Sequence, residues 1–187
     1  GRVKIDLLTK ILAKVESLEN GQNDMSDAAK TFYTTLLAKL DKMSDDQVNF
    51  YTSLLTKFGD KTDAIIDLLG NLQGGNVDLS TVEGLLAQIL AREEANGQVL
   101  LSTYDKIDLM KVTLEAIKPT LEQESEKIKK WLEDIFNKIK PCEGHNCDHS
   151  TLEAILAEIK VLIENIKATT QDPHHEGILD DLDNIFG

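Results

Sequence analysis

Two ten-residue stretches of this chain are variants of one motif: GGNVDLSTVE at residues 74–83 and GHNCDHSTLE at residues 144–153. The copies are 70 residues apart and share glycine, asparagine, aspartate, serine, threonine and glutamate at matching positions. A shorter and looser copy, GQNDMS, occupies residues 21–26. Three similar turns between long helical stretches indicate a helical array that folds back on itself.

Each copy combines a helix end with a helix start. The glycine at its first position can adopt the left-handed backbone that ends a helix. Ser80 followed by Glu83, and Ser150 followed by Glu153, have the spacing of capping boxes, in which a hydroxyl and a carboxylate bind the first free amides of the next helix. The turns therefore separate five predicted helices, at about residues 3–20, 26–72, 80–140, 150–170 and 175–186.

A seven-residue repeat of apolar side chains runs through residues 80–140. One phase contains Leu86, Leu100, Ile107, Leu114, Leu121, Ile128 and Ile135, interrupted only at Glu93. A second phase contains Val82, Ile89, Met110, Ile117 and Trp131, with polar Asn96 and Thr103 between them. Two such phases form the apolar seam of a coiled coil or bundle. Because the repeat continues past Pro119, we expect one bent helix, roughly 90 Å long at 1.5 Å per residue.

The stretch from 26 to 72 contains its own echo, FYTTLL at residues 32–37 and FYTSLL at residues 50–55. The 18-residue offset equals five helical turns, so both copies lie on one helix face. Ser44 and Gly59 are candidate breaks, but we expect one bent helix here too.

The fold class predicted is all-α, an elongated antiparallel bundle or coiled-coil-like array. Residues 1–187 then form a single elongated helical region, a fragment of a longer repetitive chain.

The composition of the chain limits the classes of molecule that it is expected to bind. The formal charge is −13, from 20 Lys and Arg against 33 Asp and Glu, and an acidic surface repels both phosphate backbones and anionic lipids. Apolar runs of about three residues are far short of the ~20 needed to span a bilayer. We therefore expect no nucleic acid and no membrane span, but a protein partner or self-association through apolar helix faces. The chain begins at Gly1, and no signal segment is present in it.

One cluster contains side chains that can form a disulfide or bind a metal, CEGHNCDH at residues 142–149. By the 70-residue offset, Cys142 replaces Leu72 and Cys147 replaces Val77. If Leu72 and Val77 touch across their turn, the two cysteines are close enough to form a disulfide, and a disulfide indicates a secreted or cell-surface protein.

Two other outcomes remain open for this cluster. Cys142, His145, Cys147 and His149 are a zinc-type ligand set, although four ligands within eight residues require the turn to wrap around the ion. Two free, partly buried thiols are the other outcome. His174 and His175 lie a helix away and are not expected to join this site.

No catalytic pattern is visible. The sequence contains no phosphate-binding glycine loop, nucleophile elbow or His-Glu-x-x-His motif. We expect no enzyme, no small-molecule substrate and no cofactor beyond the zinc alternative.

The pattern of helices and repeated turns resembles, in general character only, helical repeats of bacterial surface proteins and phage fibres. The predicted function is a structural or protein-interaction module, a helical spacer, stalk or docking scaffold of a larger extracytoplasmic bacterial or phage protein. The alternative is a binding module with a metal-binding Cys/His turn or a groove for a partner helix.

Overall fold

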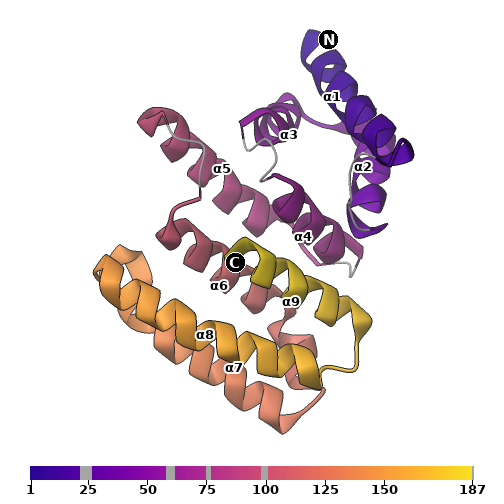
Figure 1. Ribbon diagram of the computed structural model, residues 1–187. Helices are drawn as coiled ribbons and strands as arrows, with labels where there is room; N and C mark the ends of the chain where they lie inside the picture. Colours follow the sequence, from indigo (N-terminus) through magenta and orange to yellow (C-terminus); the bar gives the residue numbers. More distant parts are fainter. Residues whose placement is uncertain (22–26, 58–61, 75–76, 98–100, 187) are drawn as a thin grey trace.

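The computed structural model describes residues 1–21, 27–57, 62–74, 77–97 and 101–186. Within these ranges the chain is helical and contains no strand, which confirms the predicted all-α class (Figure 1). The α-helices are α1 (Arg2–Glu19), α2 (Asp27–Lys39), α3 (Asp45–Lys57), α4 (Thr62–Gly74), α5 (Ser80–Asn96), α6 (Thr103–Glu122), α7 (Glu126–Ile139), α8 (His149–Thr169) and α9 (Pro173–Phe186). The described residues also include the short 3-10 helices η1 (Leu40–Lys42) and η3 (Lys140–His145).

The prediction of one bent helix over residues 26–72 is wrong, because α2, α3 and α4 are separate. Ser44 starts α3 with a capping box: its Oγ accepts the Gln47 N–H at 3.3 Å, and Gln47 Oε1 accepts the Ser44 N–H at 3.2 Å. Gly59, the other candidate break, lies outside the described residues. The local hydrogen bonds of Ser44 thus outweigh the continuous helical periodicity.

The prediction of one helix over residues 80–140 is also wrong. α5 ends at Gly97, whose left-handed backbone has a φ of 69°. α6 begins with a capping box between Ser102 and Asp105, in which Ser102 Oγ accepts the Asp105 N–H at 3.1 Å. A glycine stop and a serine start in close succession end one helix and begin the next, whatever the heptad repeat favours.

A second break in this stretch follows Pro119 but is not at it. Pro119 lies inside α6, and the chain leaves the helix only after Glu122. Ser125 then caps α7 by accepting the Lys127 N–H at 3.1 Å. The longest helix in the described ranges is α8, with 21 residues or about 30 Å, so the continuous helix of ~90 Å does not form.

The apolar repeat nevertheless predicts burial correctly across these breaks. All described members of the first phase are buried: Leu86, Ile107, Leu114, Leu121, Ile128 and Ile135. The polar interruptions mark the break itself, since Asn96 is the last residue of α5 and Thr103 the first of α6. The heptad phase therefore predicts which helix face packs inward, but it does not predict that the helix is continuous.

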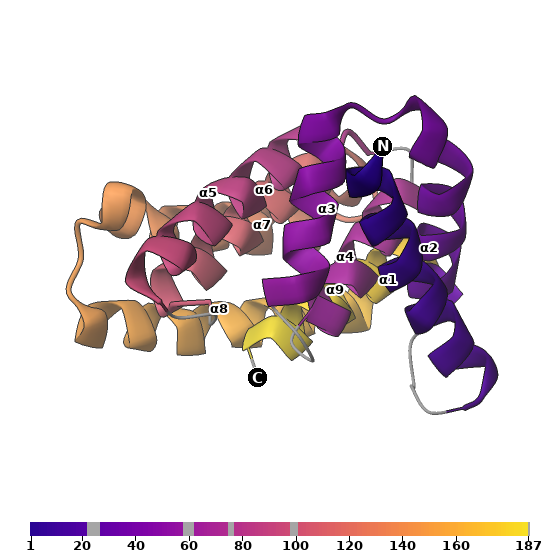
Figure 2. The same cartoon turned by 90° about the horizontal axis from the view of Figure 1, so that it is seen from above.

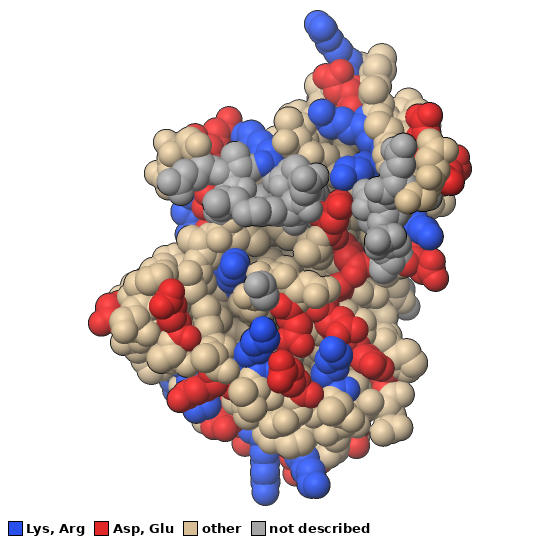
Figure 3. All heavy atoms as spheres, viewed as in Figure 1, with Lys and Arg blue, Asp and Glu red and all other residues tan. Residues whose placement is uncertain are grey.

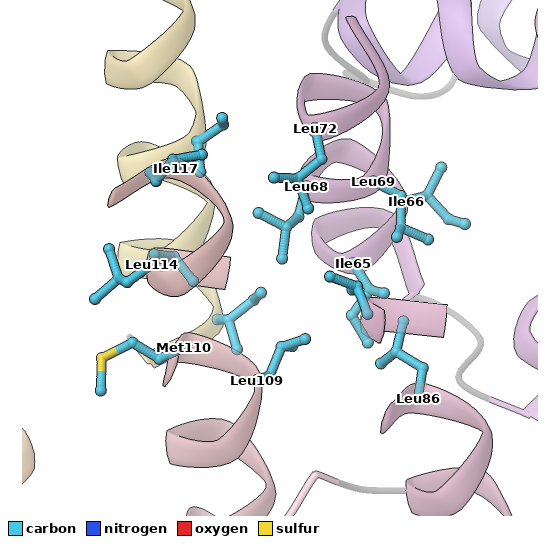
Figure 4. Packing of buried hydrophobic residues seen from close by; sticks show 14 of the residues in the cluster. Ile65, Ile66, Leu68, Leu69, Leu72, Leu86, Leu109, Met110, Leu114 and Ile117 are labelled. Carbon is cyan, nitrogen blue, oxygen red and sulfur yellow. The ribbon is translucent and has the colours of Figure 1, made fainter. Parts of the chain in front are cut away.

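α4 lies at the centre of the packing, with α2 on one side and α9 on another. Its wide apolar face buries Ile65, Ile66, Leu68, Leu69 and Leu72. Figure 4 shows residues of α4, including Leu68, facing Ile117 and Leu109 of α6 across a shared core. Gly70 permits the close approach of α2, because a Cβ at this position would lie 2.3 Å from the Ala28 carbonyl oxygen.

The C-terminal helix returns to the middle of the molecule. α9 packs against α4, α6 and α8, and so joins the N-terminal helices to the α7–α8 hairpin. Figure 2 shows this hairpin extending away from α1–α4, with the turn between α7 and α8 at its far end. Lysines and carboxylates are interspersed over the face that α8 and α9 present in Figure 3. None of the described helices combines the length and the apolar character needed to cross a membrane.

The three copies of the turn motif differ in detail. Residues 22–26 of the first copy and residues 75–76 of the second lie outside the described residues. Gly144 has left-handed backbone, with a φ of 68°, whereas Gly74 is still part of α4. The predicted capping boxes of Ser80 and Ser150 are not the caps found, because the carboxylates of Asp78 and Asp148 bind the helix starts instead. In each turn, the aspartate two residues before the serine accepts a hydrogen bond from one of the free amides at the helix start.

Candidate functional site

The cysteine-histidine turn is closed by a covalent bond. Cys142 lies in η3, directly after α7, and forms a disulfide with Cys147. Gly144 and His145 both have left-handed backbone, with φ values of 68° and 61°. Inside the loop, Asn146 Nδ2 donates a hydrogen bond to the Glu143 carbonyl at 2.7 Å. Residues 142–147 are therefore a small closed loop.

Three residues on one face of α6 hold this loop in place. The Tyr104 hydroxyl donates a hydrogen bond to the Cys147 carbonyl, and its ring lies against His145 with 4.7 Å between centroids. Asp108 Oδ2 contacts His145 Nε2 at 2.8 Å. Lys111 Nζ lies 3.1 Å from Glu143 Oε1. Because residues 104, 108 and 111 are spaced by four and three, they form one stripe, and the loop acts as a clamp between α6 and the α7–α8 hairpin.

The predicted metal ligands do not come together. Both sulfurs, of Cys142 and Cys147, are used by the disulfide and are not available as thiolates. His145 pairs with Asp108, and His149 Nε2 lies 3.0 Å from Glu153 Oε1 on the exposed side of α8. Among the described residues, no three His, Cys, Asp or Glu side chains are placed to hold a metal ion. The two histidines of the motif are surface partners of carboxylates.

A groove that the sequence did not reveal lies where α5, α6 and the start of α9 meet. Its volume is about 670 Å³. Val82 and Ile117 form a buried apolar floor, with Ala116 beside them. The remaining lining consists of Val77, Asp78, Thr81, Val112, Glu115, Thr120, Asp172, His174 and His175. Three carboxylates stand on this lining and no lysine or arginine is among its described residues, so the groove is apolar below and acidic above.

One end of the groove is fixed by a partly buried hydrogen-bond network. His175 Nδ1 contacts Glu124 Oε2 at 2.8 Å, and His175 Nε2 contacts Thr120 Oγ1 at 3.0 Å. Thr170 Oγ1 and the Gln171 N–H also donate to the Glu124 carboxylate. Burial acts to raise the pKa of Glu124, but the hydrogen bonds from Gln171, Thr170 and His175 outweigh it and hold the pKa below its usual value. The network ties the start of α9 to the α6–α7 turn.

The order hydroxyl, imidazole, carboxylate invites comparison with a nucleophilic triad. The Thr120 hydroxyl, however, donates to the Ile117 carbonyl at 2.9 Å within its own helix. Its hydrogen is thus directed along α6 and not at the imidazole. The arrangement positions α9 and gives no support to nucleophilic catalysis.

His174 also lines the groove. Its main-chain N–H donates to Asp172 Oδ1 at 2.9 Å. Its ring atom Nε2 is buried and has no hydrogen-bond partner among the described residues. A buried polar atom without a partner costs free energy.

A second hollow of about 490 Å³ adjoins the groove, because Val77 and Asp78 line both. Its base contains the rings of Phe32 and Tyr51. The Tyr51 hydroxyl donates to Glu83, and burial, followed by this hydrogen bond, raises the pKa of Tyr51 well above its usual range. The rest of the lining includes the side-chain amides of Gln47 and Gln73 and the hydroxyls of Thr35 and Ser80, together with the charged residues Lys39, Asp78 and Glu83.

A separate acidic cluster lies in the contact between α4 and α9. Asp181 is buried, receives a hydrogen bond from Asn71 Nδ2, and shares a hydrogen bond with Asp67. Burial first, and then the hydrogen bond with Asp67, raise the pKa of Asp181 to about 9. At neutral pH the Asp181 carboxyl therefore holds a proton that it donates to Asp67.

One feature of the sequence points to the groove in hindsight. Glu124 falls seven residues after Ile117, on the second apolar phase, where a carboxylate is out of place unless something satisfies it. His175 satisfies it from 51 residues away. The periodicity marks Glu124 as unusual, but its partner is set by tertiary packing.

Comparison of the chain with protein-family models finds no match, and searches of curated proteins and of solved structures find none either.

Proposed function

We propose that this chain is a protein-docking module that works outside the cytoplasm and binds its partner in the groove between α5, α6 and α9. The observation that carries the proposal is the composition of this groove. A buried apolar floor under a polar rim is the usual anatomy of a recognition site. Val82 and Ile117 belong to the buried core and line the base of the groove, while half-buried Val77, Val112 and Ala116 leave apolar surface open to it.

Rigidity supports the same reading. The groove is built on three helices, and the Glu124–His175 hydrogen bond fixes the start of α9 beside it. Sites held on packed helices need little ordering when a partner binds, and binding affinity then loses less to conformational entropy.

The disulfide supports an extracytoplasmic location. Cysteines that are five positions apart and joined in a closed loop persist in oxidising compartments and are rare in the cytosol. Protein isolated in the presence of an alkylating agent and without reductant should contain no free thiol. Two alkylated cysteines would contradict this part of the proposal.

Site-specific photo-crosslinking tests the docking site. A benzoyl-phenylalanine at Thr81, on the groove rim, should form one defined adduct with a protein of the surrounding fluid. The same group at exposed Glu133 on α7 should not. Mass spectrometry of the adduct identifies the partner and the residues that touch Thr81.

A steric block with a matched control makes the test specific. Ala116→Phe fills the groove and should abolish the Thr81 adduct, whereas Ala154→Phe on the exposed face of α8 should leave it unchanged. Circular dichroism of both variants checks that the helices are intact. An adduct that survives Ala116→Phe, or that forms equally from Glu133, would show that the groove is not the docking site.

A further inference from the structure

We infer that the occupant of this groove is an extended, basic segment of the partner, which places a lysine or arginine in the groove and its neighbouring peptide groups in the second hollow. This inference rests on the proposed docking function and names the chemistry of the partner. Two adjoining spaces with different linings carry it.

The groove has the shape and charge of a site for a long cationic side chain. Lysine and arginine combine an aliphatic stem with a charged head, and the stem gains free energy by lying on apolar surface. Half-buried Val77, Val112 and Ala116 supply such a surface. The head then lies beside the three carboxylates of the groove, Asp78, Glu115 and Asp172.

These carboxylates keep capacity for a further cation. Glu115 has a loose ion pair with Lys111, at 3.9 Å. Asp172 accepts the His174 N–H through Oδ1, and its Oδ2 lies 3.6 Å from His175 Nδ1. Asp78 is exposed and accepts the Ser80 N–H at 2.9 Å. That backbone hydrogen bond lowers the pKa of Asp78, so its carboxylate stays charged over the physiological range.

The second hollow suits peptide groups better than a second cation, because Lys39 stands on its lining and its Glu83 already accepts the Tyr51 hydroxyl. Its amides and hydroxyls, from Gln47, Gln73 and Thr35, are neutral donors and acceptors of the kind that pair with main-chain N–H and C=O groups. Because Val77 and Asp78 border both spaces, a segment that leaves the groove past Asp78 enters the second hollow directly. In an extended chain, every peptide group is free to make such contacts, whereas a helix uses them internally.

The overall charge favours the same partner. With a formal charge of −13, the chain attracts basic segments over distances of about 10 Å at moderate ionic strength. This attraction is general, and the test must separate it from recognition by the groove.

The test uses nitrogen-15 NMR of the full chain with three synthetic probes. The first is an octapeptide of alternating lysine and valine, the second has glutamate in place of lysine, and the third is lysine amide alone. The lysine-valine peptide should shift amide signals lining both spaces, including those of Thr81 and Gln73. Lysine amide should shift only those of the groove, and the glutamate peptide should shift neither.

Two charge variants separate the groove from the general acidity. Asp78→Asn should weaken binding of the lysine-valine peptide by about two- to fivefold, the range for a partly exposed ion pair. Asp134→Asn, which removes the same charge from the exposed face of α7, should leave binding unchanged. Ala116→Phe should abolish the shifts in the groove.

Each failure has its own meaning. Equal binding of the lysine and glutamate peptides, equal effects of Asp78→Asn and Asp134→Asn, or shifts confined to other surfaces would overturn the inference. If the Thr81 adduct still forms and is still lost in Ala116→Phe, the docking function stands and only the basic partner is wrong. If the adduct is absent as well, both proposals fail.

Discussion

The turn before α5 and the turn before α8 derive from one sequence motif but are closed in different ways. At the first, the Val77 N–H donates to the Leu72 carbonyl at 3.2 Å. At the second, the corresponding residues Cys142 and Cys147 are joined by a disulfide. The same two positions are therefore bridged in both turns, once by a backbone hydrogen bond and once by a covalent bond.

The two turns have different surroundings. The disulfide turn is covered by α6, through Tyr104 and Asp108. The other turn is left open, and Val77 and Asp78 line two hollows. The comparison teaches that similar motifs lie in two settings, one against a neighbouring helix and one on the lining of two hollows.

Alkaline pH should break the open turn before the closed one, and this is the largest effect we expect. The open turn, which follows Gly74, lies against α9, since Gly74 is next to His174. α9 is in turn held to α4 by Asp181, whose pKa is about 9 in the folded chain. An aspartate in an unfolded chain has a pKa of about 3.9. Between these values the folded state binds one more proton, so the free energy of unfolding falls as pH rises, by at most about 1.4 kcal/mol per pH unit.

Denaturant unfolding from pH 5 to pH 9 measures this slope, and hydrogen exchange locates it. Exchange of the Val77 amide should accelerate with pH beyond the intrinsic rate, while that of the Thr151 amide, bound by Asp148 at 2.7 Å, should follow the intrinsic rate. Asp181→Asn should flatten the slope, because asparagine can accept from Asn71 and donate to Asp67 without ionising. An unchanged slope in this variant would assign the proton to another group.

Removal of the disulfide should have the next largest effect. Cys142→Ala with Cys147→Ala should lower the free energy of unfolding by about 2 kcal/mol, since the loop it closes is short. Cys142→Leu with Cys147→Val copies the sister turn and should lose less, because it restores the apolar pair. Guanidinium unfolding of the three proteins makes the comparison. Equal loss in both variants would mean that the residues of the open turn cannot replace the bond.

The contact between Tyr104 and the disulfide turn should contribute less. Tyr104→Phe removes the hydrogen bond to the Cys147 carbonyl and should cost about 1 kcal/mol. Combined with Cys142→Ala and Cys147→Ala, it should cost less than alone, because a released loop no longer holds the carbonyl in place. Strict additivity in this cycle would show that Tyr104 and the disulfide act independently.

The two aspartates of the motif should show the smallest difference. Asp148 is the N-cap of α8, whereas Asp78 precedes the N-cap of α5, which is Leu79. Asp148→Ala should therefore lower the melting temperature more than Asp78→Ala, and Asp148→Asn should lower it less than Asp148→Ala because asparagine is also a good cap. Calorimetry at pH 7 compares the three. A larger effect at Asp78 would reverse the assignment of caps.

Helix type and inward faces were predictable from the sequence, but helix lengths were not. Apolar spacing identified Leu86, Leu114 and Ile135 as core residues, and these are buried. The same spacing hid the breaks, since it continues across Gly97 and Ser125. Capping residues within a few positions of one another decide such breaks locally, and a periodic pattern averages over them.

For the site, the cysteines were predictable and the groove was not. The substitution of Leu72 and Val77 by Cys142 and Cys147 is visible in the repeat, and it places the sulfurs within reach of each other. The partners in the groove come from helices far apart in the chain. Glu124 meets His175 only because α9 folds back along α6, and no local pattern encodes that return.

The position of α9 also sets the order in which the chain can complete its fold. The hydrogen bond from Asn71 of α4 to Asp181, 110 residues later, can form only after Asp181 has been made. As the chain is synthesised, α1–α4 emerge before the helix that packs on one side of α4, which is α9. Long-range closure of this kind slows folding, because that side of α4 stays uncovered until α9 has been made.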